Sequence, residues 1–480
     1  GEPRPEAVVI WTRLAPAPLE EGGGMRPEPV PVRWQVAHDE GFQRVVRSGV
    51  AIAHPQDAHS VHVDVAGLEP GRWYWYRFAT TGAAGTTSPV GRTRTTPALG
   101  AHPDRLRFAF ASCANFEHGW YSAYRHMATE DLDLVVHLGD YIYEHPRDAH
   151  PSPSGNVRHH AGGETITLAD YRRRLAQYRT DPDLQAVHGA FPFLALWDDH
   201  ELDNNYAGTV PEDDRPRAGF RARRAAAYRA YWEHMPLRPD RAPSGDGLRL
   251  YRRVDFGRLA GLNLLDTRQY RSDQVCGDRY PAVCPARDDP SRTMLGAAQE
   301  QWLLGGLGQR PGRWNVLAQQ VFMAQVDFVP GAERGFYLDG WDGYTAARRR
   351  LLGFVARRRP GNVVVLSGDF HSNWVTSLKA DFERPASATV ATEFVGTSIS
   401  SGGDGSDSAP YGKQALADHP HLSFFNSQRG YVRCDVTPRR WRTDFRVVPY
   451  VSRPGAPVTT RASFVVEDGR AGAHRLDGRT

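Results

Sequence analysis

The sequence DLVVHLGDYIY at residues 133–143 has the form of a buried β-strand followed at once by polar side chains. Its continuous apolar run is typical of a strand covered on both faces, as in parallel sheets. Asp140 comes directly after the strand, and Tyr143 lies three residues further on. Ligands of open α/β sheets bind where the carboxyl ends of the strands meet. The stretch therefore predicts an α/β domain with its functional site at that edge.

Three further segments repeat this design of an apolar strand that ends on residues able to bind a metal. They are RFAFASC at residues 107–113, FPFLALWDDHE at residues 191–201 and VVVLSGDFH at residues 363–371, which end on Cys113, on Asp198, Asp199, His200 and Glu201, and on Asp369 and His371. In the last segment we expect both side chains on one side of an extended chain, because strand side chains alternate. The four segments together predict a metal-dependent hydrolase.

Each strand end also has a simpler structural interpretation. Tyr143 is equally typical of a rim aromatic, and Cys113 alone of a core thiol. Residues 198–201 also fit a turn with one capping Asp, and residues 369–371 a buried His bonded to Asp. A phenolate ligand needs a strong Lewis acid such as iron(III), because a free phenol ionises near pH 10. The position shared by all four segments favours the metal site.

The organisation of the chain changes near residue 98. Residues 1–98 contain aromatic-rich and alternating runs separated by turns, which predict an all-β, fibronectin III-like sandwich. After a linker at residues 95–100, strands alternate with helices, which predicts the α/β domain. We expect helices at residues 124–131, 168–178, 218–234, 297–307 and 345–358. We divide the chain into a sandwich at 1–98, a catalytic domain at 104–450 and a C-terminal extension at 451–480 packing on or near it.

Composition excludes several classes of function. A chain of 480 residues is too long for one ordinary core, so two or more domains are expected. The net charge of +4 is small and unclustered, which gives no nucleic-acid footprint. No apolar stretch approaches the roughly 20 residues that span a bilayer.

The cysteines predict the cellular compartment. Cys276 and Cys284 flank a short loop in which a disulfide forms easily, and such a bond implies an oxidising compartment. Cys434 is expected to be a buried thiol. The chain also begins like a processed one, with a signal peptide already absent, so we expect a secreted, extracellular protein.

The combined motifs resemble the PhoD-type alkaline phosphatase D family. They are Ser112-Cys113, Gly139-Asp140 with Tyr143, WDDHE at residues 197–201, LDTR at 265–268, SGDFH at 367–371 and FNSQRGY at 425–431. This family is a variant of the calcineurin-like metallophosphatases, in which purple acid phosphatases also use an iron–tyrosinate. The wider pattern has Asp at position 113, Asn at 199 and His at 369. The resemblance implies a four-layer α/β domain, with two mixed sheets flanked by helices, behind the sandwich.

The resemblance also implies ligands and roles. Iron(III) would be held by Cys113, Asp140, Tyr143 and His371, and one or two calcium ions by Asp140, Asp199 and Asp369, with Asn205 and Gln320 as further candidates. Other divalent metals are alternatives at the second position. His200 and Asp199 would act in catalysis, with His200 facing the phosphate. Arg268 would contact phosphate or form a salt bridge to Asp266.

The predicted function is hydrolysis of phosphomonoesters, phosphodiesters or both, by in-line attack of a metal-bound hydroxide. One alternative is a phospholipase D-type activity on lipid head groups, as in secreted actinobacterial relatives, with peripheral contact to a lipid surface. No HKD motif is present. A second alternative is a secreted binding module with a structural metal. Aromatic residues either line the site mouth or belong to the core, namely Phe116, Trp120, Tyr206, Phe336, Tyr337 and Trp341. The loop at 400–407 either lines the mouth or has no role, and the oligomeric state stays open.

Overall fold

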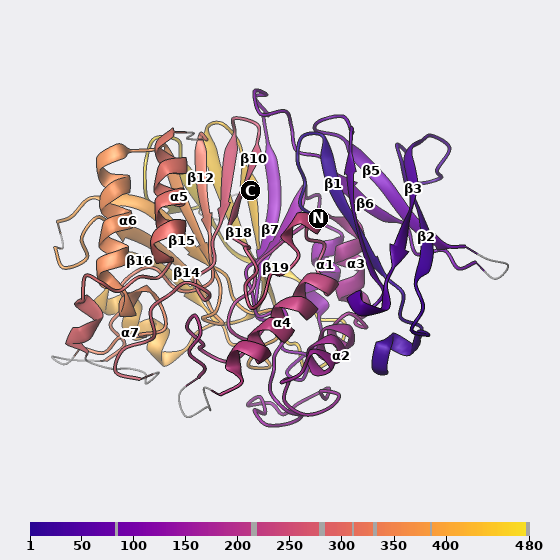
Figure 1. Cartoon of the computed structure of the whole chain (residues 1–480). Coiled ribbons are helices and arrows are strands. Elements are labelled where there is room, and N and C mark those ends of the chain that lie inside the picture. Colours follow the sequence, from indigo (N-terminus) through magenta and orange to yellow (C-terminus); the bar gives the residue numbers. More distant parts are fainter. Residues whose placement is uncertain are drawn as a thin grey trace.

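The N-terminal part of the chain is a β-sandwich. The computed structural model describes residues 1–81, 85–212, 218–277, 284–309, 312–329, 334–384 and 386–476. One sheet of the sandwich has the strand order β3-β2-β5-β6, and the other pairs β1 with β4. The strands are β1 Ala7–Arg13, β2 Val30–Ala37, β3 Val45–Ala53, β4 Ser60–Ala66, β5 Trp73–Thr80 and β6 Gly91–Arg94. Figure 1 shows them at one side of the molecule.

Two seven-stranded sheets make up the second part of the chain. One has the order β20-β19-β18-β17-β7-β8-β9 and the other the order β10-β11-β12-β13-β15-β14-β16. The strands of the first are β7 Leu106–Ala111, β8 Leu134–His137, β9 Phe193–Ala195, β17 Arg429–Val436, β18 Arg440–Val448, β19 Thr459–Glu467 and β20 His474–Arg475. Those of the second are β10 Arg252–Phe256, β11 Ala260–Leu264, β12 Trp314–Ala318, β13 Asn362–Ser367, β14 Asn373–Lys379, β15 Thr389–Val395 and β16 Leu422–Asn426.

The sheets face each other across one core and are covered by helices outside. Phe108 and Phe110 of β7 point into the core between the sheets, and Ala109 and Ala111 point to the helix side. Both faces of β7 are buried, which explains its unbroken apolar run. The helices are α1 Ser122–Ala128, α2 Leu168–Tyr178, α3 Pro182–Ala190, α4 Phe220–His234, α5 Gly296–Gln309, α6 Thr345–Arg358 and α7 Pro410–Asp418. The predicted four-layer fold behind an all-β domain is confirmed.

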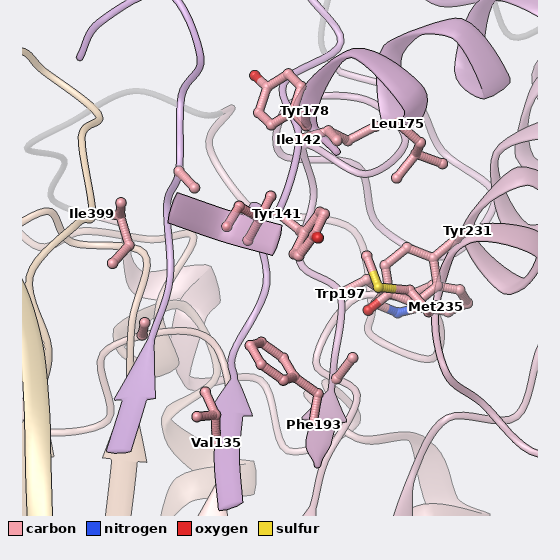
Figure 2. Packing of buried hydrophobic residues seen from close by; sticks show 14 of the residues in the cluster. Val135, Tyr141, Ile142, Leu175, Tyr178, Phe193, Trp197, Tyr231, Met235 and Ile399 are labelled. Atoms are coloured by element: carbon pink, nitrogen blue, oxygen red, sulfur yellow. The ribbon is translucent and has the colours of Figure 1, made fainter. Parts of the chain in front are cut away.

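The helices divide between the two outer faces. α1 to α4 pack over β7, β8 and β9, and α5 and α6 pack over the second sheet. Figure 2 shows part of the first helix layer, in which Trp197 lies close to Tyr231 and Met235, near Phe193 of β9. Helices α2 and α6 have the bounds expected from the sequence, whereas α3 and α7 were not predicted. Asp181 caps α3 by accepting hydrogen bonds from two backbone N–H groups.

The strand directions bring the functional segments to one edge. β7, β8 and β9 run parallel in the first sheet, and β11, β12, β13 and β15 run parallel in the second. A bridge between Ser112 and Ser398 joins the loop after β7 to the loop after β15. The carboxyl ends of strands from both sheets therefore meet.

The C-terminal residues and the cysteines complete the fold. Residues 459–467 form β19, which pairs with β18 inside the first sheet. Cys276 and Cys284 form the expected disulfide, with Cα atoms 6.2 Å apart, and Cys434 is a buried free thiol. Among the residues described, no helix has the length and apolar character needed to cross a bilayer.

Candidate metal centre

The four strand ends converge on one group of ligand atoms. Cys113, Asp140 and His371 place one ligand atom each within 4.8 Å of one another, and so do Asp140, Asp199 and His200. A third group of the same kind joins Asp199 to Asp369 and to Asp198. Because the groups share Asp140 and Asp199, they form one continuous centre. Cys113 and His371 lie at one end and Asp369 at the other.

Tyr143 lies beside the first of these groups. Its hydroxyl is 3.1 Å from Oδ2 of Asp140 and 3.3 Å from Nε2 of His371. Oγ of Ser401, which belongs to the loop at residues 400–407, donates a hydrogen bond to the Tyr143 hydroxyl at 2.7 Å. The structure therefore places Tyr143 inside the centre and the loop against it.

Five of the candidate ligands have a left-handed backbone. The φ angles are positive at Cys113, Asp140, Asn205, Asp369 and His371, with values from 50° to 61°. Such a conformation costs of order 1 kcal/mol or more for a residue with a side chain. The prediction of an extended chain at Asp369 and His371 is therefore wrong. The turn places the two side chains in different groups. The strained backbone is maintained where it aims side chains into the centre.

The centre concentrates negative charge away from water. One carboxylate oxygen each of Asp140 and Asp369 is buried without a hydrogen-bond partner among the described residues, and the corresponding oxygen of Asp199 has only an ion pair with Arg268. Burial, with the nearby carboxylates, raises the pKa of Asp369 to about 7 and holds the pKa of Asp140 well above its usual value. Buried carboxylates of this kind are paired or bind a metal. A cation would supply the missing partner, since metal ligands bind in their deprotonated form. The donor set fits a metal site.

A pocket of about 500 Å³ opens on the centre. Its lining combines candidate ligands with aromatic and amide side chains, namely Asp140, Asp199, His200, Asn204, Asn205, Tyr337, Asp369, Phe370, His371 and Tyr411. A volume of this size accommodates a small organic ligand beside the ions. The arrangement leaves room for a ligand beside the candidate metal ligands.

Comparison with known proteins assigns this centre to a family. A family model described as PhoD-like phosphatase matches residues 108–445, and one described as PhoD-like phosphatase, N-terminal domain, matches residues 1–97. The chain belongs to the PhoD-like phosphatase family. Alkaline phosphatase D of Bacillus subtilis (strain 168) is 51% identical over 480 residues, which cover 100% of this chain and 82% of that protein.

Solved structures agree with this assignment. The structure of PhoD matches with a TM-score of 0.97 and 51% identity, covering 100% of this chain and 91% of that chain. Purple acid phosphatase PPD1 from yellow lupin (Lupinus luteus) matches with a TM-score of 0.59 and 13% identity, covering 97% and 72%, which shows a shared fold. The resemblance found in the sequence is confirmed, and the chain is a hydrolase of phosphate esters. Membership of this family excludes the non-catalytic binding module.

His200 of this PhoD-like phosphatase is held by a residue that sequence reasoning missed. Its Nδ1 lies 2.7 Å from Oε2 of Glu144, which is fully buried, so Nε2 is the nitrogen free to face the pocket. Burial lowers the pKa of His200, but Glu144, Asp199 and Asp140 outweigh it and hold the pKa well above the usual value. Glu144 therefore fixes the orientation of the imidazole ring. In the sequence, only its position directly after Tyr143 could have indicated a role for Glu144.

Glu201 holds two of the strand ends together. Its carboxylate accepts hydrogen bonds from the backbone N–H of Asp140 at 3.0 Å and of Asp198 at 2.7 Å. Gly139 between them has no room for a side chain, because a Cβ there would lie 2.5 Å from the backbone nitrogen of Asp198. The loops after β8 and β9 are thus locked side by side.

The side chain of Arg268 does not form the salt bridge to Asp266 that was one of its two expected roles. It is fully buried and does not line the pocket, and its guanidinium pairs with Asp198 and Asp339. Asp266 instead accepts from the backbone N–H of Arg268 at 3.0 Å. One guanidinium nitrogen is 3.3 Å from Oδ1 of Asp199. Arg268 therefore positions the acidic ligands from behind.

Replacing Arg268 with methionine should lower the free energy of unfolding by about 3–5 kcal/mol, because it leaves buried carboxylates without their partner. Urea denaturation of both proteins measures the loss. The matched control is Arg350→Met, which breaks a surface pair with Glu300 and should cost about 1 kcal/mol or less. Equal losses of unfolding free energy in Arg268→Met and Arg350→Met would contradict the structural role given to Arg268.

Two further candidate ligands differ in placement. Asn205 lines the pocket, and its backbone N–H donates to Asp199 at 2.8 Å. Gln320 is fully buried outside the pocket lining, and its amide bonds to Thr267 at 2.6 Å and to the carbonyl of Leu265 at 2.9 Å. The structure brings Asn205 to the centre and leaves Gln320 occupied in the core.

The aromatic candidates divide in the same way. Tyr337 lines the pocket. Four others are buried in hydrophobic clusters, namely Phe116, Tyr206, Phe336 and Trp341. Trp120 is half-buried and lies under the guanidinium of Arg158. Phe370 and Tyr411, which sequence reasoning did not select, complete the pocket wall.

Proposed function

We propose that this phosphoesterase uses an asymmetric metal pair, iron(III) beside calcium. The observation that carries the proposal is the position of Asp140, which belongs both to the group with Cys113 and His371 and to the group with Asp199 and His200. Thiolate, imidazole and phenolate donors suit iron, and an all-oxygen set suits calcium. Iron would bind Cys113, Asp140, Tyr143 and His371, and calcium would bind Asp140, Asp199, Asp369 and Asn205. Such cations, when bound, stabilise charge on phosphoryl oxygens and activate a water as nucleophile.

In this proposal His200 completes the reaction. Its Nε2 faces the pocket as a proton donor, and Glu144 fixes the opposite nitrogen. The leaving oxygen gains negative charge as its bond to phosphorus breaks, and a proton from Nε2 neutralises it. Arg268 and Glu201 keep the acidic side chains in position without contacting the substrate.

Replacing Tyr143 with phenylalanine should remove a visible absorption band. A phenolate bound to iron(III) absorbs visible light by charge transfer, and the variant lacks the phenolate oxygen. The matched control is Tyr141→Phe, since Tyr141 is equally buried and bonds to His188 away from the centre. Absorption spectra should be recorded together with iron analysis. A band that survives in Tyr143→Phe with iron still bound would refute the assignment.

We infer that diesters are preferred over monoesters. The pocket wall of Tyr337, Phe370 and Tyr411 offers an apolar surface to a second ester substituent, which a monoester lacks. We expect kcat/KM for bis-p-nitrophenyl phosphate to exceed that for p-nitrophenyl phosphate by about tenfold or more. A faster reaction with the monoester would overturn this preference.

A phospholipase D-type activity is the second candidate, because Tyr411, which lines the pocket, is an exposed aromatic residue at 42%. Phosphatidylcholine vesicles in the same assay test it directly. Choline release at a rate comparable to diester hydrolysis would support a lipid substrate. Absence of release would restrict the enzyme to soluble diesters.

We also propose that the protein is secreted. The disulfide between Cys276 and Cys284 supports this, since such bonds persist in oxidising compartments. Protein from its natural source, denatured with a chelator and no reductant, should show free thiols only at Cys113 and Cys434. Titration of all four thiols before reduction would contradict secretion.

A further inference from the structure

A second cleft lies where the sandwich meets the helices of the catalytic part. It has a volume of about 740 Å³, compared with about 500 Å³ for the pocket at the metal centre. β1 and β5 supply the walls on one side, and α2, α3 and the end of α4 supply the other. The volume lies in the range of small-molecule sites. None of its lining residues belongs to the metal centre.

Two arginines place positive charge on the cleft, and the buried carboxylate of Glu233 behind it acts on Arg13 without forming a salt bridge with it. Arg13 and Arg179 line it, no Asp or Glu does, and neither guanidinium forms a salt bridge to any described residue. Arg13 donates to the carbonyl of Ala58 at 3.0 Å, and burial lowers its pKa to about 10. One terminal nitrogen of Arg179 donates to the carbonyl oxygen of His234, and its Nε is buried without a hydrogen-bond partner among the described residues. Partly buried cations that form no salt bridge are costly, so an anion in direct contact with these guanidinium groups would be bound favourably here.

The cleft also holds a free hydrogen-bond acceptor. His234 is 1% exposed, and its Nδ1 lies 2.8 Å from the carbonyl oxygen of Ala230. A carbonyl only accepts, so Nδ1 carries the proton and Nε2 has a lone pair. That Nε2 is buried and has no partner among the described residues. A hydroxyl group is the natural donor to it.

Aromatic rings complete the lining. The guanidinium of Arg179 lies 4.7 Å from the ring centroid of Trp11. Tyr76 packs edge-on against Phe78, with ring centroids 6.2 Å apart. Gly91 gives the ring of Tyr76 its space, since a Cβ there would lie 2.3 Å from that ring. These rings offer apolar faces to the carbon face of a ligand, next to the two cations.

We propose that this cleft binds an anionic sugar, phosphorylated or carboxylated, at a site separate from the metal centre. The two guanidinium groups contact the anion, Nε2 of His234 accepts from a sugar hydroxyl, and the aromatic rings cover the carbon face. The proposal gives the sandwich a binding role and does not depend on which metals occupy the centre.

Calorimetric titration of the intact enzyme with glucuronate tests the proposal, because glucuronate has no phosphate to hydrolyse. We expect a dissociation constant in the millimolar range or tighter, and at least tenfold weaker binding of neutral glucose. Arg13→Gln and Arg179→Gln should each weaken glucuronate binding tenfold or more, and Arg13→Lys should retain most of it. Arg33→Gln, an exposed charge on the same domain, is the matched control and should change nothing.

Two further measurements separate this site from the metal centre. Glucuronate binding should persist in Asp140→Ala, and hydrolysis of bis-p-nitrophenyl phosphate should be unchanged in Arg13→Gln. Thermal melting confirms that each variant is folded. The proposal is overturned by undetectable glucuronate binding, by equal binding of glucose, by full binding in folded Arg13→Gln and Arg179→Gln, or by loss of binding in Asp140→Ala.

Discussion

Replacing Asp140 with alanine is expected to abolish hydrolysis, with kcat/KM reduced at least about 1,000-fold. Asp140 is 1% exposed, and it is the carboxylate shared by the group containing Cys113 and the group containing Asp199. Its loss removes a ligand from both metal positions at once. The variant should therefore also lose both metals, which metal analysis of the purified protein measures alongside steady-state kinetics.

The matched control is Asp131→Ala, a carboxylate 84% exposed at its side chain and paired with Arg107 at the surface. It should keep full activity and metal content. An Asp140→Ala protein with unchanged metals and normal turnover would exclude Asp140 as the bridging ligand, and the proposed pair of metals with it.

Replacing His200 with alanine should lower kcat about 10²- to 10⁴-fold while both metals stay bound. The imidazole lies beside Asp140 and Asp199, and in the proposed mechanism it acts as a proton donor and not as a ligand. Glu144→Gln should cause a smaller loss in the same direction, because it weakens the orientation of the ring. Kinetics with metal analysis separates the two roles.

The choice of leaving group sharpens this test. A poor leaving group depends more on protonation, so His200→Ala should lose more activity with an alkyl ester than with a nitrophenyl ester. His126→Gln is the control, because this histidine bonds to the carbonyl of Ala456 away from the pocket. Equal losses with both esters, or loss of metal from His200→Ala, would contradict the role of proton donor.

The architecture was predictable because burial on both faces leaves a continuous apolar run. Phe108 and Phe110 face one core and Ala109 and Ala111 the other, and such a strand is recognisable without a structure. The convergence of the strand ends follows from parallel pairing. The strand-end position drew attention to Cys113, Asp140 and Asp369 and to the acidic residues after β9, whereas the family resemblance selected Asp199 and assigned the ligand roles.

The surroundings of the ligands were not predictable, since they depend on contacts between distant loops. The partner of Arg268 is Asp339, and the residue against Tyr143 is Ser401, each separated by long stretches of chain. The prediction of side-chain direction at the strand end after β13 was wrong for a different reason. Left-handed turns at Asp369 and His371 replace the strand alternation on which the expectation was based.

Gln320 illustrates the limit of position as a guide. It follows β12 in the same way that the candidate ligands follow their strands, yet both ends of its amide are used by Thr267 and Leu265. A polar residue at a strand end can bind a metal only if its side chain is not already hydrogen-bonded to neighbouring groups. Such capture is visible only in three dimensions.

The most direct test of the account follows hydrolysis of bis-p-nitrophenyl phosphate while calcium is removed by a selective chelator and then returned, with iron content measured throughout. We predict that activity disappears as calcium leaves, that about one iron per chain remains bound, and that added calcium restores the rate. Full activity in protein free of calcium or free of iron would contradict the proposed iron–calcium centre.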